Sequence, residues 1–371
     1  MSRNIAAYIL ICAAPLASGP AASIEYDLRG QASAYHLESR SDGGRAHGSG
    51  IRYIPIFELA QRLPGTTFID LDAAVDAWAA TGSSMEDDWD IELYRLELRF
   101  ATARSETRLG LQKINFGPGR LLRPLRWFDR LDPRDPLQIT EGVYAMRFIC
   151  TAPDNANLWL WGLYGNDDPK GYEFMETSDD RPELGGRLQI PMGPGELGLT
   201  VHNRKVDPGL PGAPSFGESR FAVDGRWDVL VGAWFEAVLQ QQTAVRMSTA
   251  WTKTVMMGTD YTFGVGSGLH VLIEHMWSRV TTKEPMLDPG IDTDVSAFML
   301  GYPVGYLDYI QAIGYYDWEN EEYCQFASWQ RTWDNLAVNL SLFHNPELTA
   351  TGLATAMTAG TGGQIILMYN H

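Results

Sequence analysis

Apolar and polar residues alternate along much of this chain. Residues 91–100 read IELYRLELRF, and from Tyr94 on every second side chain is apolar while those between are charged. The apolar face holds Tyr94, Leu96, Leu98 and Phe100, and the charged face holds Arg95, Glu97 and Arg99. Residues 66–78 repeat the pattern, with aliphatic side chains opposite three aspartates. A period of two with one apolar face predicts β-strands rather than helices.

The same alternation, interrupted by turn residues, predicts eighteen strands along the chain. Sixteen strands are the alternative, because sequence patterns place strand boundaries only to within a few residues. The predicted strands span residues 24–38, 51–62, 66–78, 91–103, 106–115, 142–152, 156–166, 185–191, 195–203, 218–227, 229–241, 249–265, 268–279, 294–303, 306–317, 321–331, 334–345 and 363–371.

The predicted connections differ in length between the two ends of these strands. Every connection after an even-numbered strand is short, as in RLPG and ATAR. Connections after odd-numbered strands are expected to be mostly long, with the one after 306–317 as an exception. A transmembrane β-barrel has short turns at one rim and long loops at the other, whereas a sandwich with Greek-key crossings would not keep this alternation. We therefore predict an all-β, antiparallel transmembrane barrel.

The first residues have the composition of a secretory signal peptide. Arg3 precedes an apolar stretch, Ile5 to Ala17, and small residues follow up to Ser23. That stretch is too short to cross a bilayer as a helix. We expect residues 1–23 to be a cleaved signal peptide and residues 24–371 to form the barrel. No later segment is apolar over eighteen consecutive residues, so no transmembrane helix is predicted.

Two segments resemble parts of known outer-membrane proteins. Residues 362–371, GGQIILMYNH, alternate at Ile365, Leu367 and Tyr369 and resemble the terminal strand of such proteins. Residues 108–120, RLGLQKINFGPGR, resemble the strand that leads into the third external loop of several porin families. Architecturally, the chain from residue 24 on resembles a Gram-negative outer-membrane porin. The resemblance implies contact with outer-membrane lipid and lipopolysaccharide, and a homotrimer as one assembly it allows.

The resemblance also gives a position to an unusual stretch. Residues 117–136 read GPGRLLRPLRWFDRLDPRDP, with five arginines, three aspartates and four prolines. They fall within loop 116–141, the third external loop, which in porins folds into the lumen and narrows it. We expect a short helix to start at Arg123-Pro124 and to end at Asp132-Pro133, and Leu125, Trp127 and Phe128 to anchor the loop on the wall. Its candidate constriction residues are Arg120, Arg123, Arg126, Asp129, Arg130, Asp132, Arg134 and Asp135.

The predicted wall beside this loop is also charged. The lumen-facing candidates on the three neighbouring strands are Arg95, Glu97, Arg99, Arg108 and Arg147. Residues 104–147 hold nine basic and five acidic residues in a chain of net charge -17. Charges act strongly at a constriction of low dielectric, so we predict an eyelet that tolerates or prefers anions. The loop aspartates could face the wall arginines and set a transverse field.

Two other roles for the loop charges stay open. They could form a self-neutralising salt-bridge network outside the lumen, or they could bind lipopolysaccharide phosphates, which arginine favours. A nucleic-acid ligand is disfavoured by the acidity of the chain. The chain has no GxSxG motif, and its seven histidines are scattered, so no enzyme is predicted.

The function that these patterns favour is passive diffusion of ions and small hydrophilic solutes, anionic ones among them. The concentration gradient drives such transport, so no cofactor or metal is implied. Two alternatives belong to other classes. A conduit barrel could sheathe a periplasmic partner such as a cytochrome, and would need an unobstructed lumen. An exporter of an acidic polymer would need a continuous arginine ladder.

Overall fold

The computed structural model describes residues 24–83, 85–179, 181–210, 212–243, 250–282, 290–346 and 359–371. The expected signal peptide, residues 1–23, lies outside them. The described strands form one antiparallel sheet. They are β1 (Ile24–Ser41), β2 (Gly44–Arg62), β3 (Phe68–Gly82), β4 (Met85–Ala101), β5 (Ser105–Gln112), β6 (Val143–Thr151), β7 (Asn157–Leu163), β8 (Glu176–Thr177), β9 (Glu183–Met192), β10 (Gly195–Asp207), β11 (Phe216–Asp228), β12 (Gly232–Thr243), β13 (Ala250–Phe263), β14 (Leu269–Thr281), β15 (Ile291–Val304), β16 (Asp308–Asp317), β17 (Glu322–Thr332), β18 (Leu336–Asn345) and β19 (Gly360–Asn370).

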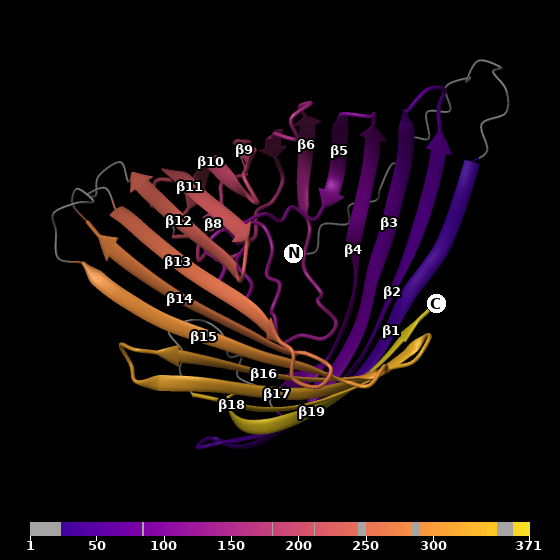
Figure 1. Ribbon diagram of the computed structural model, residues 1–371, viewed down its shortest axis with the longest axis vertical. Helices are drawn as coiled ribbons and strands as arrows, with labels where there is room; N and C mark the ends of the chain where they lie inside the picture. The colour runs from indigo at the N-terminus through magenta and orange to yellow at the C-terminus, as the bar shows by residue number, and fades with distance from the viewer. Residues whose placement is uncertain are drawn as a thin grey trace.

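The sheet closes on itself as a barrel. β1 pairs with β2 on one side and with β19 on the other, and Figure 1 shows indigo β1 beside yellow β19 at this closure. The two residues of β8 pair only with β10, so eighteen strands make the ring. The predicted class and the number eighteen are confirmed, and each predicted range overlaps an observed strand. The described residues contain no helix long and apolar enough to cross a membrane.

The apolar face of the strands points outward and the polar face inward. On β4, Leu98 is 45% exposed whereas Glu97 is 7% exposed. A lipid-facing outer surface and a wet lumen produce this inversion of a soluble sheet. The pairing of β3 with β4 shifts between Ala74 and Val75, which leaves Tyr94 as an extra residue. This β-bulge explains why Leu93 and Leu96 are both exposed outward, although their positions differ in parity.

The connections confirm one half of the predicted alternation and correct the other. Those after even-numbered strands of the ring are all short: 63–67, 102–104, 152–156, 193–194, 229–231, 264–268, 305–307 and 333–335. At the opposite rim, however, only 42–43 joins β1 to β2 and only 83–84 joins β3 to β4, where longer loops were predicted. The four strands form two hairpins, with Ser41 opposite Gly44 and Gly82 opposite Met85. Residues 39–50, SRSDGGRAHGSG, lack an apolar face, which hides the strand from a period-two search.

Two long connections stand side by side at that rim. They are residues 113–142, between β5 and β6, and residues 164–182, between β7 and β9. We call this rim the long-loop rim, and the rim with the connections 63–67 to 333–335 the short-turn rim. The two connections carry the side chains that form the candidate site.

Candidate functional site

Segment 113–142 contains no helix, so the short helix predicted to start at Arg123-Pro124 is wrong. Only isolated turns form, as where the Arg126 amide donates to the Arg123 carbonyl oxygen at 3.0 Å. Inside the predicted helix, the Arg130 amide donates to the Thr140 hydroxyl oxygen at 3.3 Å, whereas an α-helix would use it for the carbonyl oxygen four residues before. Other amides of the segment donate to carboxylates on distant strands.

Glu274 on β14 gathers most of these amides. Its Oε1 accepts from the Arg120 amide at 2.7 Å, and its Oε2 accepts from the amides of Leu121 and Leu122 at 2.8 and 2.6 Å. The indole Nε1 of Trp234 on β12 donates to Oε1 at 2.9 Å. Hydrogen bonds to an ionised carboxylate are stronger than neutral ones. Glu274 thus fixes three consecutive residues of the segment.

Glu236 on β12 fixes the residues on either side of these three. It accepts from the amides of Gly119 at 2.7 Å and Leu125 at 2.9 Å. Both carboxylates belong to the inward face, since Glu274 is fully buried while its neighbour Ile273 is 52% exposed outward. β12 and β14 pair with neither β5 nor β6. The bonds therefore hold residues 119–125 against the inward face of a distant part of the sheet.

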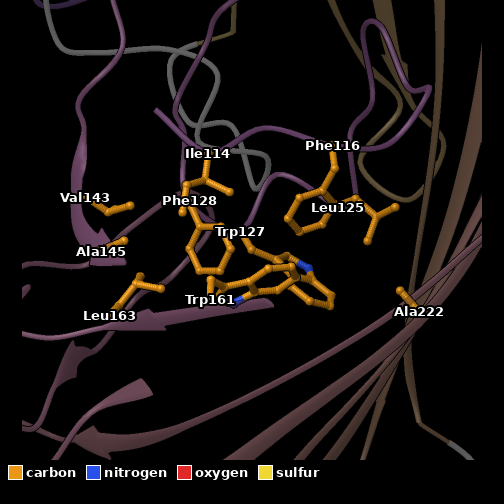
Figure 2. Close-up of a cluster of buried hydrophobic side chains, with 10 residues drawn as sticks. All are labelled: Ile114, Phe116, Leu125, Trp127, Phe128, Val143, Ala145, Trp161, Leu163 and Ala222. Carbon is orange, nitrogen blue, oxygen red and sulfur yellow. The ribbon is translucent and has the colours of Figure 1, made fainter. Parts of the chain in front are cut away.

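Aromatic side chains hold the same segment on the nearer wall (Figure 2). Leu125, Trp127 and Phe128 are buried there, which confirms their predicted anchoring role. Phe116 stacks on Trp161 of β7 with ring centroids 5.5 Å apart, and Phe128 meets Trp161 edge-on at 5.8 Å. Such aromatic pairs add to the stabilisation from buried area. The wall residues of this cluster are Val143, Ala145, Trp161, Leu163 and Ala222.

The loop aspartates contact loop groups rather than wall arginines. Asp129 pairs with Arg123 at 3.3 Å, and Asp132 pairs with Arg134 at 2.8 Å. Burial raises the pKa of Asp132, but the hydrogen bonds from Arg134 outweigh it and leave that pKa below its usual value. The sequence suggested that the loop aspartates face the wall arginines and set a transverse field. Asp129 and Asp132 instead pair with arginines of their own loop.

Asp135 binds the backbone of its own loop. Its two carboxylate oxygens accept from the amides of Leu137 at 2.9 Å and Ile139 at 3.2 Å. Burial raises the pKa of Asp135, and these two hydrogen bonds only partly offset it. Asp135 is thus placed to stabilise the turn that returns the segment toward β6.

The three other arginines of the segment differ in their surroundings. The Arg126 guanidinium lies over the ring of Tyr172 at 3.9 Å from its centroid, and Arg130 donates to the Pro169 carbonyl oxygen. These contacts join segment 113–142 to segment 164–182. Within the described part of the chain, no carboxylate lies within ion-pair distance of the Arg120 guanidinium, which lines a cavity.

The wall arginines share a glutamate that the sequence analysis missed. Glu106 on β5 receives Arg108 at 2.7 Å, Arg99 at 3.4 Å and Arg147 at 3.6 Å. Its parity matches that of Arg108, so the alternation could have placed it on the inward face. The other ion pairs of this wall are Arg99 with Asp70 at 2.8 Å and Arg108 with Glu97 at 2.6 Å.

Arg95 connects this wall to the loop instead of joining the ion pairs. Its Nη2 donates to the carbonyl oxygen of Thr140 at 2.6 Å. Arg95 follows the bulged Tyr94, and its guanidinium lies 4.0 Å from the centre of that ring. The five predicted wall residues are therefore brought to one side of the barrel, four of them in ion pairs.

A buried charged network joins segment 164–182 to strands β9, β10 and β11. Glu173 receives Arg220 at 2.7 Å, Arg204 at 2.9 Å and Lys170 at 3.2 Å. Glu218 receives Arg220 at 2.5 Å and Arg204 at 2.7 Å. All five side chains are buried. Paired charges that also satisfy one another's hydrogen bonds can stay ionised in such a place.

The network continues to the aromatic cluster. Lys170 also forms an ion pair with Glu183 at 2.9 Å. The other carboxylate oxygen of Glu183 lies 3.1 Å from Nε2 of His202. The Trp161 indole nitrogen lies 3.3 Å from Nδ1 of His202. The sequence analysis missed this network. Alternation could have placed its strand members on the inward face, but Lys170 and Glu173 lie in a connection without any period.

Gly171 offers a test of how closely the two connections pack. Its φ is +52°, and an added Cβ would meet the Arg126 carbonyl oxygen and lie 2.8 Å from the carbonyl carbon of Trp127. We expect Gly171→Ala to destabilise the barrel by about 1–3 kcal/mol, from backbone strain plus this clash. The loss of stability is measured as the temperature at which half of the protein changes from the gel mobility of the folded barrel to that of the unfolded chain. Gly165→Ala is the matched control, because φ is +74° there and nothing lies within 4 Å.

Two cavities lie beside segment 113–142. The short-turn cavity, of about 780 Å³, is lined by segment residues 115–121 and by side chains near the short-turn rim, including Glu196, Arg226 and Asp260. The long-loop cavity, of about 690 Å³, is lined by segment residues 139–142 and by residues 165–170. Segment 113–142 therefore lines both a cavity near one rim and a cavity near the other.

Comparisons with known proteins bear on the fold. No protein-family model matches the chain, and no curated protein does either. Among solved structures, Pseudomonas aeruginosa OccK2 (OpdF) superposes with a TM-score of 0.61 at 12% identity, covering 93% of this chain and 97% of that one. The same protein in complex with glucuronate gives 0.57 at 11% identity, covering 93% and 98%. An anion-selective porin from Comamonas acidovorans gives 0.52 at 10% identity, covering 94% and 100%.

These likenesses extend over nearly the whole chain, and at such low identity they concern its architecture. The closed antiparallel ring is the feature of this chain on which they bear. The chain has the fold of the outer-membrane β-barrel porins.

Proposed function

We propose that this protein is a diffusion channel of an outer membrane for small hydrophilic solutes, narrowed by segment 113–142. The observation that carries the proposal is the set of hydrogen bonds that backbone amides of residues 119–125 donate to the carboxylates of Glu236 and Glu274. A segment held on two walls of one barrel obstructs its lumen, leaving a compartment on either side. Glycines at 117 and 119 fit this position, because a Cβ on either would lie within 3.0 Å of Glu236.

Anionic solutes are the class we favour for the short-turn cavity. Four arginines line it, against the carboxylates of Glu196 and Asp260. The partners of two of these arginines, Asp129 and Asp224, are buried and do not line the cavity, whereas the arginines do. More guanidinium groups than carboxylates therefore line the space. An anion-selective porin and a porin in complex with glucuronate are among the structures with this fold, which supports the same class.

An unobstructed conduit fits these contacts poorly. A periplasmic partner sheathed by the barrel would have to displace segment 113–142 from both carboxylates. An exporter of an acidic polymer would need free arginines along the lumen, whereas most inward-facing arginines are engaged, as Arg187 is with Asp224 at 2.5 Å. Membrane lipid and lipopolysaccharide as surroundings, a homotrimeric assembly and export by residues 1–23 stay predictions.

Planar-bilayer recording under a salt gradient tests the proposal. We expect the wild-type protein to conduct, and Arg120→Ala to shift the reversal potential toward cation preference. The permeability ratio should change roughly two- to six-fold, since a unit charge 4–8 Å away contributes about 0.5–1 kcal/mol in water. Arg104→Ala removes the same charge from an exposed turn outside both cavities and should change little.

Two results would count against the proposal in different ways. A purified, heat-modifiable barrel that never conducts would rule out a channel. If the barrel conducts but Arg120→Ala and Arg104→Ala have the same reversal potential, then neither Arg120 nor the short-turn cavity determines the ion preference.

A further inference from the structure

The two cavities differ in the charge that they present. In the long-loop cavity, Glu92, Glu141, Asp167 and Asp168 line the space, and no ion-pair partner for them lies among the described residues. Asp76 and Glu141 both lie near enough to repel Glu92. Of the three basic residues that line it, only Arg130 has no carboxylate partner in the described part of the chain. Arg52 pairs with Asp76, and Lys170 belongs to the buried network.

The short-turn cavity presents the opposite sign on its surface. Its pairs Arg123–Asp129 and Arg187–Asp224 are both buried, and the arginine of each pair lines the space whereas the aspartate does not. Arg120 adds a charge without a carboxylate partner among the described residues. Glu196 and Asp260 also line this cavity, so its net positive charge is small. The property that matters for a passing solute is the difference in charge between the two cavities.

We propose that the pore has a charge step along its axis, which selects zwitterionic small solutes and rectifies ionic current. This inference rests on the proposed channel function and adds a solute class to it. A solute with an ammonium group at one end and a carboxylate at the other lowers its energy with the ammonium in the long-loop cavity and the carboxylate in the short-turn cavity. A dianion is repelled by the first compartment, and a dication finds no partner in the second.

Rectification follows from the same step. Mobile cations carry most of the current through an acidic compartment, and anions carry a larger share beyond it. When the long-loop side is positive, cations and anions are driven toward the junction between the compartments and accumulate there, so conductance rises. The opposite voltage depletes the junction. In 1 M salt the Debye length falls to about 3 Å, and the asymmetry should largely vanish.

Paired variants test the step without any need to know how the barrel is oriented in the bilayer. We expect Glu92→Gln with Glu141→Gln to move the permeability ratio toward anions, and Arg120→Gln to move it toward cations. Both variants should reduce the ratio of currents at opposite voltages toward one. This combination, opposite shifts in selectivity with the same loss of rectification, is particular to a charge step.

Liposome swelling tests the solute class with three probes of one chain length: 5-aminopentanoate, glutarate and 1,5-diaminopentane. The zwitterion should enter roughly two- to three-fold faster than either of the others, from about 0.5 kcal/mol gained per matched end. Glu92→Gln with Glu141→Gln should remove this preference.

The outcomes separate this inference from the proposed function. A barrel without conductance overturns the channel, and the charge step with it. A conducting barrel with symmetric currents in low salt, or one that admits glutarate faster than 5-aminopentanoate, leaves the channel intact and overturns the charge step.

Discussion

Replacing Glu274 by glutamine is expected to release residues 120–122 from the wall and to raise single-channel conductance. Glutamine offers one acceptor oxygen where glutamate offers two, and its amide group would face backbone N–H donors. Hydrogen bonds to a charged group contribute roughly 1.5–3 kcal/mol each. With three backbone amides on this carboxylate, the attachment should weaken by about 3 kcal/mol or more.

The measurement is single-channel recording, with current noise as a second readout of loop motion. Glu196→Gln is the matched control, because Glu196 lines the short-turn cavity, as residues 120 and 121 do, and its carboxylate accepts from Gln189 rather than from segment 113–142. Heat-modifiable mobility shows whether each variant folds. A folded Glu274→Gln barrel with wild-type conductance and noise would show that this attachment does not set the width of the pore.

The strands of this barrel could be predicted because lipid outside and water inside impose a local rule on every residue. Leu98 and Glu97 differ in exposure for this reason alone, and no knowledge of distant residues is needed to assign them. The rule fails where its cause is absent. The β1–β2 and β3–β4 hairpins continue through residues without an apolar face, and the bulge at Tyr94 reverses the parity along one strand.

The attachments of the connections could not be predicted in the same way. Alternation alone places Glu236 and Glu274 on the inward face. Nothing local indicates that the amides of Gly119 and Leu125 will reach Glu236, because these partners are more than a hundred positions apart in sequence. The predicted helix failed for a related reason. Within its span the Arg130 amide donates to the hydroxyl oxygen of Thr140, ten residues further on, rather than to the carbonyl oxygen four residues before it.

The charges of the loop show the same division. The sequence predicted the aspartates and arginines of 117–136 as a set, and they do lie together. Which of these charges remain free for a solute depends on their ion pairs. Asp129, for example, pairs with Arg123 of the same loop, whereas the sequence predicted that the loop aspartates could face wall arginines. Arg123 and Arg134 pair within the loop, whereas no carboxylate lies within ion-pair distance of Arg120 in the described part of the chain.

Replacing Glu218 by glutamine should destabilise the barrel more than any other single change considered for this chain. Glu218 is fully buried and accepts from Arg204 and Arg220, and also from the amides of Gln240 and Gln242 at 2.8 and 2.7 Å. Removing one partner from a buried ion pair costs about 3–5 kcal/mol, because the remaining charge is left uncompensated. Arg204 and Arg220 keep Glu173 as a partner but share one carboxylate where they had two, so the lower part of this range is expected.

The midpoint of unfolding in urea, followed by gel mobility in lipid vesicles, measures this loss. Asp292→Asn is the matched control: Asp292 pairs with Arg279 across β14 and β15 at 2.5 Å, but both side chains are about one third exposed. Exposed pairs contribute little because water already solvates both charges. If the two variants unfold at the same urea concentration, the buried network adds no stability, and its charges would have to be kept for another reason, such as holding segment 164–182 beside the pore.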